Sequence, residues 1–194
     1  MKLGHNITSL ALHLAIAFFH RKCYVNHDRF IVLTAALLLA TKLRDMDSRL
    51  KILCSRFDQV IKQQNLMTIG RGMMGNSEME LYTEDKYRRL KDEITIAESE
   101  LLRTLEYDID FISPYEYIKK YCDIFFPVNF SSNEREKLSK EDMKNRELNK
   151  KLYIGTRVIL LDSYRTRASL CYSPLVIFLS CFLIACNYEK CLPQ

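Results

Sequence analysis

The spacing of apolar side chains along the chain predicts helices. From Ile7 to Cys23, leucine, isoleucine and phenylalanine recur on two helical stripes, so this segment is apolar nearly all round. A second helix is expected from the N-cap residue Asp28 through Arg44, where the run from Phe30 to Leu39 again covers every face. Two neighbouring helices of this kind belong in the middle of a bundle, with other helices packed around them.

The next two helices are expected to be amphipathic. The first begins at Asp47 or Ser48 and ends at residue 62, with one apolar stripe and charges opposite, as in a surface helix. The stretch 63–82 shows neither helical nor strand periodicity and is expected to be a loop. Thr83, followed by two acidic residues, is expected to cap a long helix that runs through Glu106.

Three more helices are expected in the second half of the chain. Ser113-Pro114 and Ser173-Pro174 are start signals for two of them, the first ending by residue 127 and the second near residue 188. The third is expected over about 145–170, after a densely charged stretch that is expected to be a solvated connection. With only five glycines and four prolines in 194 residues, the chain has too few breaks for an all-β sandwich. The expected fold class is therefore all-α.

A weak internal echo bears on the number of domains. After a shift of about 145 residues Phe19 lies over Tyr164, and in both regions a helix, a short turn and an all-apolar helix follow one another. The echo favours two duplicated helical domains. Chance similarity between two buried helices is the alternative.

Charge and hydropathy restrict the partners. The net charge is +5, but basic residues are interleaved with acidic ones, as in Lys86–Glu93, so no direct nucleic-acid contact is expected. No charged residue lies between Arg167 and Glu189, yet the apolar part, Leu175–Cys186, is shorter than the roughly 20 residues of a membrane span. A buried helix is therefore expected there, and a membrane-anchored protein that uses residues 168–188 is an alternative.

Cysteine, glycine and histidine patterns give no catalytic or metal site. The cysteines are odd in number, lie mostly in apolar runs and form no Cys-x-x-Cys pair, so they are expected to be reduced core residues of an intracellular protein. The glycine pattern Gly70–Gly75 lacks the flanking strand of a phosphate site and is expected to be a surface loop. On one helix His13 and His20 would stand roughly 10 Å apart, too far for one zinc ion. Neither a catalytic residue nor a cofactor is expected.

Two charged residues inside apolar helices are more informative. Lys42 follows the apolar run that ends at Thr41, and Glu98 lies between Ile94 and Leu101. Each side chain could simply reach solvent at a helix edge. Alternatively, the two could face each other as an ion pair, which is costly to desolvate and often marks a recognition surface.

At these residues the sequence resembles the cyclin box. Thr34–Leu43 looks like the third helix of the box, in which small and leucine residues lead to a lysine, and Asp92–Ile109 looks like the fifth helix, with its signature glutamate at Glu98. Ser113–Ile118 is similar to the start of the second box in transcription-type cyclins such as cyclins K, T, L and C. Arg165–Leu170 with Ser173–Leu175 resembles the second and third helices of that box, so the resemblance covers nearly the whole chain.

The resemblance implies a cyclin-like helical bundle of two partial boxes. Residues 1–112 would form the first box without its first helix, and residues 113–194 the second box, truncated at its C-terminus. A fragment and a naturally abbreviated cyclin both fit. Arg44 and Asp45 depart from the two acidic residues that the family often has there, so the electrostatic choice of kinase could differ.

The resemblance also implies a function. Lys42 and Glu98 would hydrogen-bond backbone groups at the regulatory helix of a kinase. The apolar side chains expected to pack against that helix are Leu39, Leu43, Leu102 and Ile109. The chain is thus expected to be a non-catalytic nuclear subunit, with a cytoplasmic location left open, that binds and activates a cyclin-dependent serine/threonine kinase in transcription by RNA polymerase II. A cyclin-fold scaffold of a transcription complex, without kinase activation, is the alternative.

Overall fold

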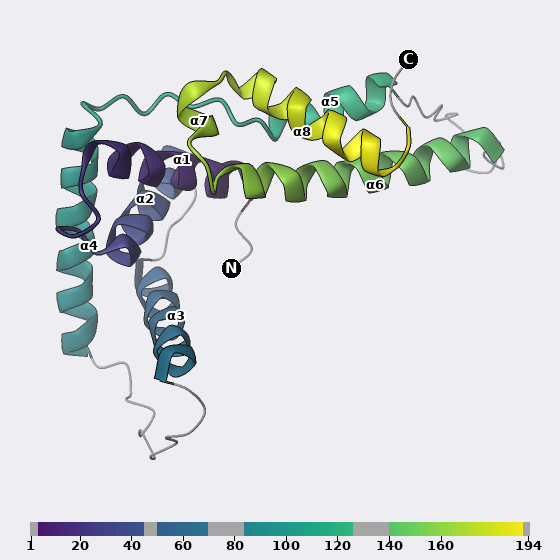
Figure 1. The fold of residues 1–194 in the computed structure, drawn as a ribbon. Helices are drawn as coiled ribbons and strands as arrows, with labels where there is room; N and C mark the ends of the chain where they lie inside the picture. The colour runs from purple at the N-terminus through teal and green to yellow at the C-terminus, as the bar shows by residue number, and fades with distance from the viewer. Residues whose placement is uncertain (1–3, 45–49, 70–83, 126–139, 192–194) are drawn as a thin grey trace. The chain divides into compact units, whose positions relative to one another are not determined.

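The computed structural model describes residues 4–44, 50–69, 84–125 and 140–191, which form helices and contain no strand (Figure 1). The expected all-α class is confirmed for this part of the chain. The arrangement of a cyclin box stays a prediction. The chain divides into two compact units, Met1–Ile109 and Asp110–Gln194. The boundary expected after residue 112 lies close to this division.

In the described part of unit one, four helices surround a centre of small residues. They are α1 (His5–Arg21), α2 (Arg29–Leu43), α3 (Leu50–Ile69) and α4 (Glu84–Thr104). α2 packs against each of the other three, and Figure 1 shows it among them. Ala35, Ala36 and Ala40 are completely buried along α2. Because short side chains let helix axes approach closely, α2 can be covered from several sides at once.

The expected start of α2 is confirmed. The Asp28 carboxylate accepts hydrogen bonds from the backbone N–H groups of Phe30, at 2.7 Å, and Ile31, at 3.4 Å. These are two of the donors that a helix start leaves without an internal partner. The cap therefore fixes where α2 begins and how the preceding turn approaches it.

α3 is longer than expected. It runs to Ile69, so the loop expected over 63–82 is wrong for 63–69. Those residues are mostly glutamine, leucine and methionine, which form helices well without an amphipathic pattern, and the first glycine comes at residue 70. The expected caps Asp47, Ser48 and Thr83 and the glycine pattern Gly70–Gly75 lie outside the described residues.

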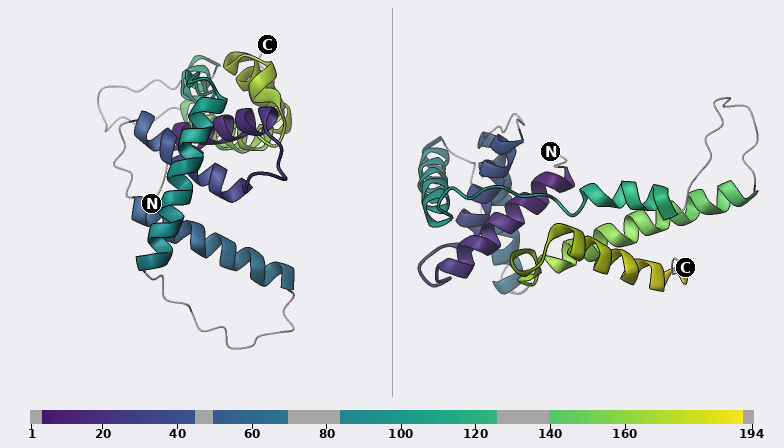
Figure 2. Two further views of the ribbon diagram at one scale, coloured as in Figure 1. Left: turned by 90° about the vertical axis from the view of Figure 1, so that its left-hand side faces the viewer. Right: turned by 90° about the horizontal axis from the view of Figure 1, so that it is seen from above.

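Unit two is built on an antiparallel helix pair. Its helices are α5 (Glu116–Phe125), α6 (Lys140–Ser163), α7 (Ala168–Cys171) and α8 (Pro174–Tyr188). α6 and α8 lie side by side in Figure 1 and in the right panel of Figure 2, and α5 packs on both. Gly155 faces Ala185 across the pair, where a Cβ on the glycine would lie 3.7 Å from that of Ala185. The core side chains include Leu152, Leu160, Phe178 and Phe182.

The single helix expected over 145–170 is wrong. α6 ends at Ser163, and a turn leads to α7. In this turn the Thr166 hydroxyl donates to the Ser163 carbonyl at 2.7 Å and accepts from the Ala168 N–H at 3.2 Å. A hydroxyl that bonds nearby backbone groups competes with the helical pattern, which explains the break at an apolar-periodic stretch.

α8 begins at Pro174, as expected, but it is not buried on every side. Val176, Leu183 and Ile184 on its outer face are about half exposed, whereas Phe178 and Phe182 face the core. The burial expected for this helix therefore holds for its inner face and not for its outer face. Within the described residues, none of the helices has the length and apolar character needed to cross a membrane.

Candidate partner-binding site

The two charged residues singled out in the sequence meet in unit one. Lys42 lies in the last turn of α2 and Glu98 in α4, and α2 packs along α4. The Lys42 ammonium lies 2.7 Å from one oxygen of the Glu98 carboxylate and 2.8 Å from the other. Lys42 and Glu98 therefore form the ion pair that was one of the two interpretations of these charges, the other being that each side chain simply reaches solvent.

The pair is buried unequally. The Glu98 side chain is 10% exposed and the Lys42 side chain 53%. A carboxylate out of water needs a partner for its charge, and the ammonium supplies that partner by bonding both oxygens. An ammonium has three N–H donors, so one is left beyond these two bonds. The surface therefore presents a half-exposed ammonium that is held in place by a buried carboxylate.

The four apolar residues expected at the site have different exposures. Leu43 is exposed and Leu102 half-buried, and helical spacing places Leu102 one turn beyond Glu98 on the same face of α4. Ile109 is half-buried beyond the end of α4. Leu39 is buried, so it supports Lys42 from the core and offers little area to a partner.

The end of α4 is shaped by contacts that the sequence did not indicate. Glu106 and Tyr107 adopt left-handed backbone conformations, with φ of 56° and 61°, and the Tyr107 N–H returns to the Leu102 carbonyl at 2.9 Å. The Arg21 guanidinium donates to the Thr104 carbonyl and lies 3.4 Å from the Glu106 carboxylate. Such a turn directs the chain sharply away from the helix axis. No local signal pairs Arg21 with a helix end 83 residues away.

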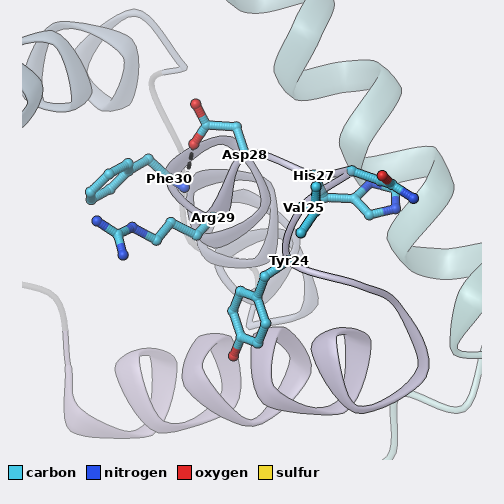
Figure 3. Close-up of a pocket in the computed structure, with 7 residues that line it drawn as sticks. Tyr24, Val25, His27, Asp28, Arg29 and Phe30 are labelled. Carbon is cyan, nitrogen blue, oxygen red and sulfur yellow. Dashed lines mark hydrogen bonds between the residues drawn. The ribbon is translucent and has the colours of Figure 1, made fainter.

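Two shallow hollows lie where the turn after α1 enters α2. One, of about 630 Å³, is lined by residues 24–30 (Figure 3). Figure 3 shows His27 directed toward α4 and the Asp28 carboxylate bonded at the start of α2. The other, of about 240 Å³, is lined by apolar side chains that include Ile31 and Ile96 and by charged side chains that include Glu93 and Glu100. The sequence had not indicated either one.

The charges around the second hollow are mostly paired. Glu100 lies 3.9 Å from the Lys22 ammonium and 3.7 Å from the His27 ring. Asp28 is occupied as the helix cap. These groups join the turn to α2 and α4, so we assign them to the structure of unit one.

The described residues contain no cluster of three or more histidine, cysteine, aspartate or glutamate side chains suited to a metal ion. No protein-family model matches the chain, and no curated protein matches it. A function for the chain is therefore inferred from the Lys42–Glu98 pair.

Proposed function

We propose that the chain is a cyclin-type regulatory subunit that binds a cyclin-dependent serine/threonine kinase and activates it. The observation that carries the proposal is the Lys42–Glu98 pair, formed between two helices with its carboxylate buried and its ammonium half exposed. The resemblance of Thr34–Leu43 and Asp92–Ile109 to two cyclin-box helices supports the same residues independently of the geometry.

The chemistry of the pair suits the end of a foreign helix. Helix ends carry backbone N–H and C=O groups that have no partner within the helix. The remaining donor of Lys42 can bond a carbonyl oxygen, and the Glu98 oxygens can accept from amides. Leu43 and Leu102 would exclude water around these bonds, which strengthens them.

Activation follows if the kinase helix has two positions. In protein kinases a lysine–glutamate pair within the kinase must form before phosphoryl transfer, and the position of the regulatory helix controls this pair. A subunit that binds only the active position shifts the kinase toward it. Because Lys42 and Glu98 already hold each other, little side-chain order has to be gained on binding.

The resemblance to transcription-type cyclins suggests a kinase of RNA polymerase II transcription and a complex in the nucleus. A cyclin-fold scaffold without kinase activation is the competing function. The two differ in one measurable property, since only the regulatory subunit raises the activity of a bound kinase.

The test uses the full chain with a panel of purified cyclin-dependent kinases. Binding is measured by pull-down, and activity by phosphate transfer to a peptide of the RNA polymerase II tail. We expect Lys42→Glu and Glu98→Lys each to abolish both signals. Normal binding by both variants would show that the pair is not the contact, and binding without activation would favour the scaffold.

A charge swap separates folding from binding. The double variant Lys42→Glu with Glu98→Lys restores an ion pair between α2 and α4, but it presents reversed charges to the kinase. We expect it to unfold at nearly the same urea concentration as the unchanged chain and still not to bind. The matched control is the exposed pair of Lys51 and Glu84, whose charges lie 3.8 Å apart between α3 and α4. Swapping that pair should leave binding intact.

A further inference from the structure

The end of α8 brings two thiols together. After Tyr188, Lys190 adopts a left-handed backbone conformation with φ of 54°, and the Cys191 N–H returns to the Cys186 carbonyl at 2.9 Å. This way of ending a helix places the side chains of the two bonded positions in contact. The Cys191 thiol lies 3.6 Å from the Cys186 carbonyl oxygen, and the Cys191 side chain packs against the core cluster that contains Cys186.

The two thiols differ in access and in chemistry. Cys186 is completely buried, whereas Cys191 is only partly buried. Burial raises the pKa of both thiols, that of Cys186 to about 12. Because a raised pKa leaves less of each thiol as the reactive thiolate, the access of solvent decides which of the two reacts first. A reagent from solvent therefore reaches the partly exposed Cys191 before the buried Cys186.

Other uses of the pair fit less well. A metal site would need further ligands, and the described part of the chain offers no suitable group of three or more. Cys122 lies near enough to Cys186 to influence its titration, but it is itself buried. Cys23 and Cys171 are exposed, so the expectation that the cysteines are core residues is wrong for these two.

We propose that Cys191 and Cys186 are an oxidisable pair that forms a disulfide within the last turn of α8 when a peroxide is present. The Cys191 thiol releases its proton, and the thiolate attacks one oxygen of hydrogen peroxide, so that an S–O bond forms and the O–O bond breaks. The departing hydroxide takes up the proton that Cys191 released and leaves as water. The Cys186 sulfur then attacks the sulfenic sulfur of Cys191, so that the S–S bond forms and the hydroxyl leaves as water with the Cys186 proton. Two thiols and one hydrogen peroxide give one disulfide and two waters.

A tryptic digest can show the disulfide directly. Trypsin cleaves after Arg167 and Lys190, so Cys186 and Cys191 fall on separate peptides, 168–190 and 191–194. The full chain is treated with hydrogen peroxide, its free thiols are blocked with N-ethylmaleimide after denaturation, and the digest is analysed by mass spectrometry. We expect these peptides to be linked, with fragmentation placing the bond at Cys186. A bond from Cys191 to Cys171 or Cys181, or no bond at all, would overturn the proposal.

Variants test whether Cys186 is the thiol that forms the disulfide with oxidised Cys191. In Cys186→Ala the link should disappear, and Cys191 should accumulate as sulfinic acid because no neighbour consumes its sulfenic form. The matched control, Cys122→Ala, removes a buried neighbour and should leave the link unchanged. If Cys122→Ala abolishes the link while Cys186→Ala preserves it, the pairing is wrong. Should Cys186→Ala fail to fold, the link position in the unsubstituted chain decides alone.

Discussion

The two units join their helices in different ways. In unit one, ion pairs connect separate elements, as in Lys42–Glu98 and in Lys86–Asp58, where the ammonium lies 2.7 Å from the carboxylate. In the described part of unit two, the ion pairs Lys151–Glu147 and Arg165–Asp162 each join residues three or four positions apart in the chain. Aromatic rings join the helices of this part of unit two.

In unit two, side chains from different helices pack through their aromatic rings. Phe178 packs on Tyr117, Tyr121 and Phe182, with ring centroids 5.0–5.8 Å apart, and Phe125 stacks on Phe182. Such contacts are strong but tolerate many apolar neighbours, whereas a buried ion pair accepts only a partner with the right polar groups. The difference explains why unit one, and not unit two, offers a candidate recognition site.

The largest effect expected from this comparison is in the core of unit two. Phe178→Ala removes a completely buried ring and should cost about 3–5 kcal/mol of unfolding free energy. Urea unfolding of the full chain, followed by a dye on the exposed Cys171 in a background with Cys23→Ser and Cys191→Ser, measures it. Tyr172→Ala, at an exposed tyrosine, is the control and should change the midpoint little. A loss below about 1 kcal/mol would mean that the rings are not the main contact.

A smaller effect is expected at the ion pair of unit one. Lys42→Met leaves the buried Glu98 carboxylate without its cation and should cost about 1–2 kcal/mol, since the half-exposed ammonium is partly replaceable by water. Adding Glu98→Met should recover most of that loss, because neither charge then remains. Urea unfolding, followed by a dye on the exposed Cys23 in a background with Cys171→Ser and Cys191→Ser, gives both values. Equal stability of all three chains would show that the pair contributes nothing to folding.

The smallest expected effect is a difference in pH response. Burial lowers the pKa of His13 in unit one from 6.5, so the unfolded chain takes up a proton first, and unit one loses stability as pH falls below about 6.5. In unit two, burial raises the pKa of Cys122 and Cys181 from 9.0 to about 11, so the unfolded chain releases protons first. Unit two should therefore lose stability as pH rises from about 9 toward 11.

The same two dye-labelled chains test this response. Urea midpoints are measured at about pH 5, 7 and 10, which lie on either side of the unfolded-state pKa values of 6.5 and 9.0. They should fall toward acid for the Cys23 dye and toward alkali for the Cys171 dye. With His13→Gln, the urea midpoint reported by the Cys23 dye should fall less between pH 7 and pH 5. With Cys122→Ala and Cys181→Ala together, the midpoint reported by the Cys171 dye should fall less between pH 7 and pH 10. Identical pH profiles for both dyes would contradict the contrast between the units.

Local signals in the sequence predicted the helices well where one residue decides the outcome. Asp28 as a cap and Pro174 as a helix start need only their immediate neighbours, and both were found. The break at Thr166 and the turn held by Arg21 were missed for different reasons. The first depends on a hydroxyl that competes with the helix, and the second on a contact between distant segments.

The candidate site was predicted in identity but not in geometry. Lys42 and Glu98 were noticed because charge interrupts apolar runs, and the resemblance to the cyclin box suggested that they act together. Spacing within each helix could not show that the carboxylate would be buried and the ammonium half exposed. That asymmetry depends on how α2 crosses α4, which is decided by packing rather than by local pattern.

The alanines of α2 bear on how a complex would form. Lys42 lies on α2, which packs closely against α1, α3 and α4. Moving α2 along its axis would therefore disrupt all three interfaces at once. If a kinase binds at Lys42 as proposed, it would meet a rigid surface, and any rearrangement on assembly would fall to the kinase.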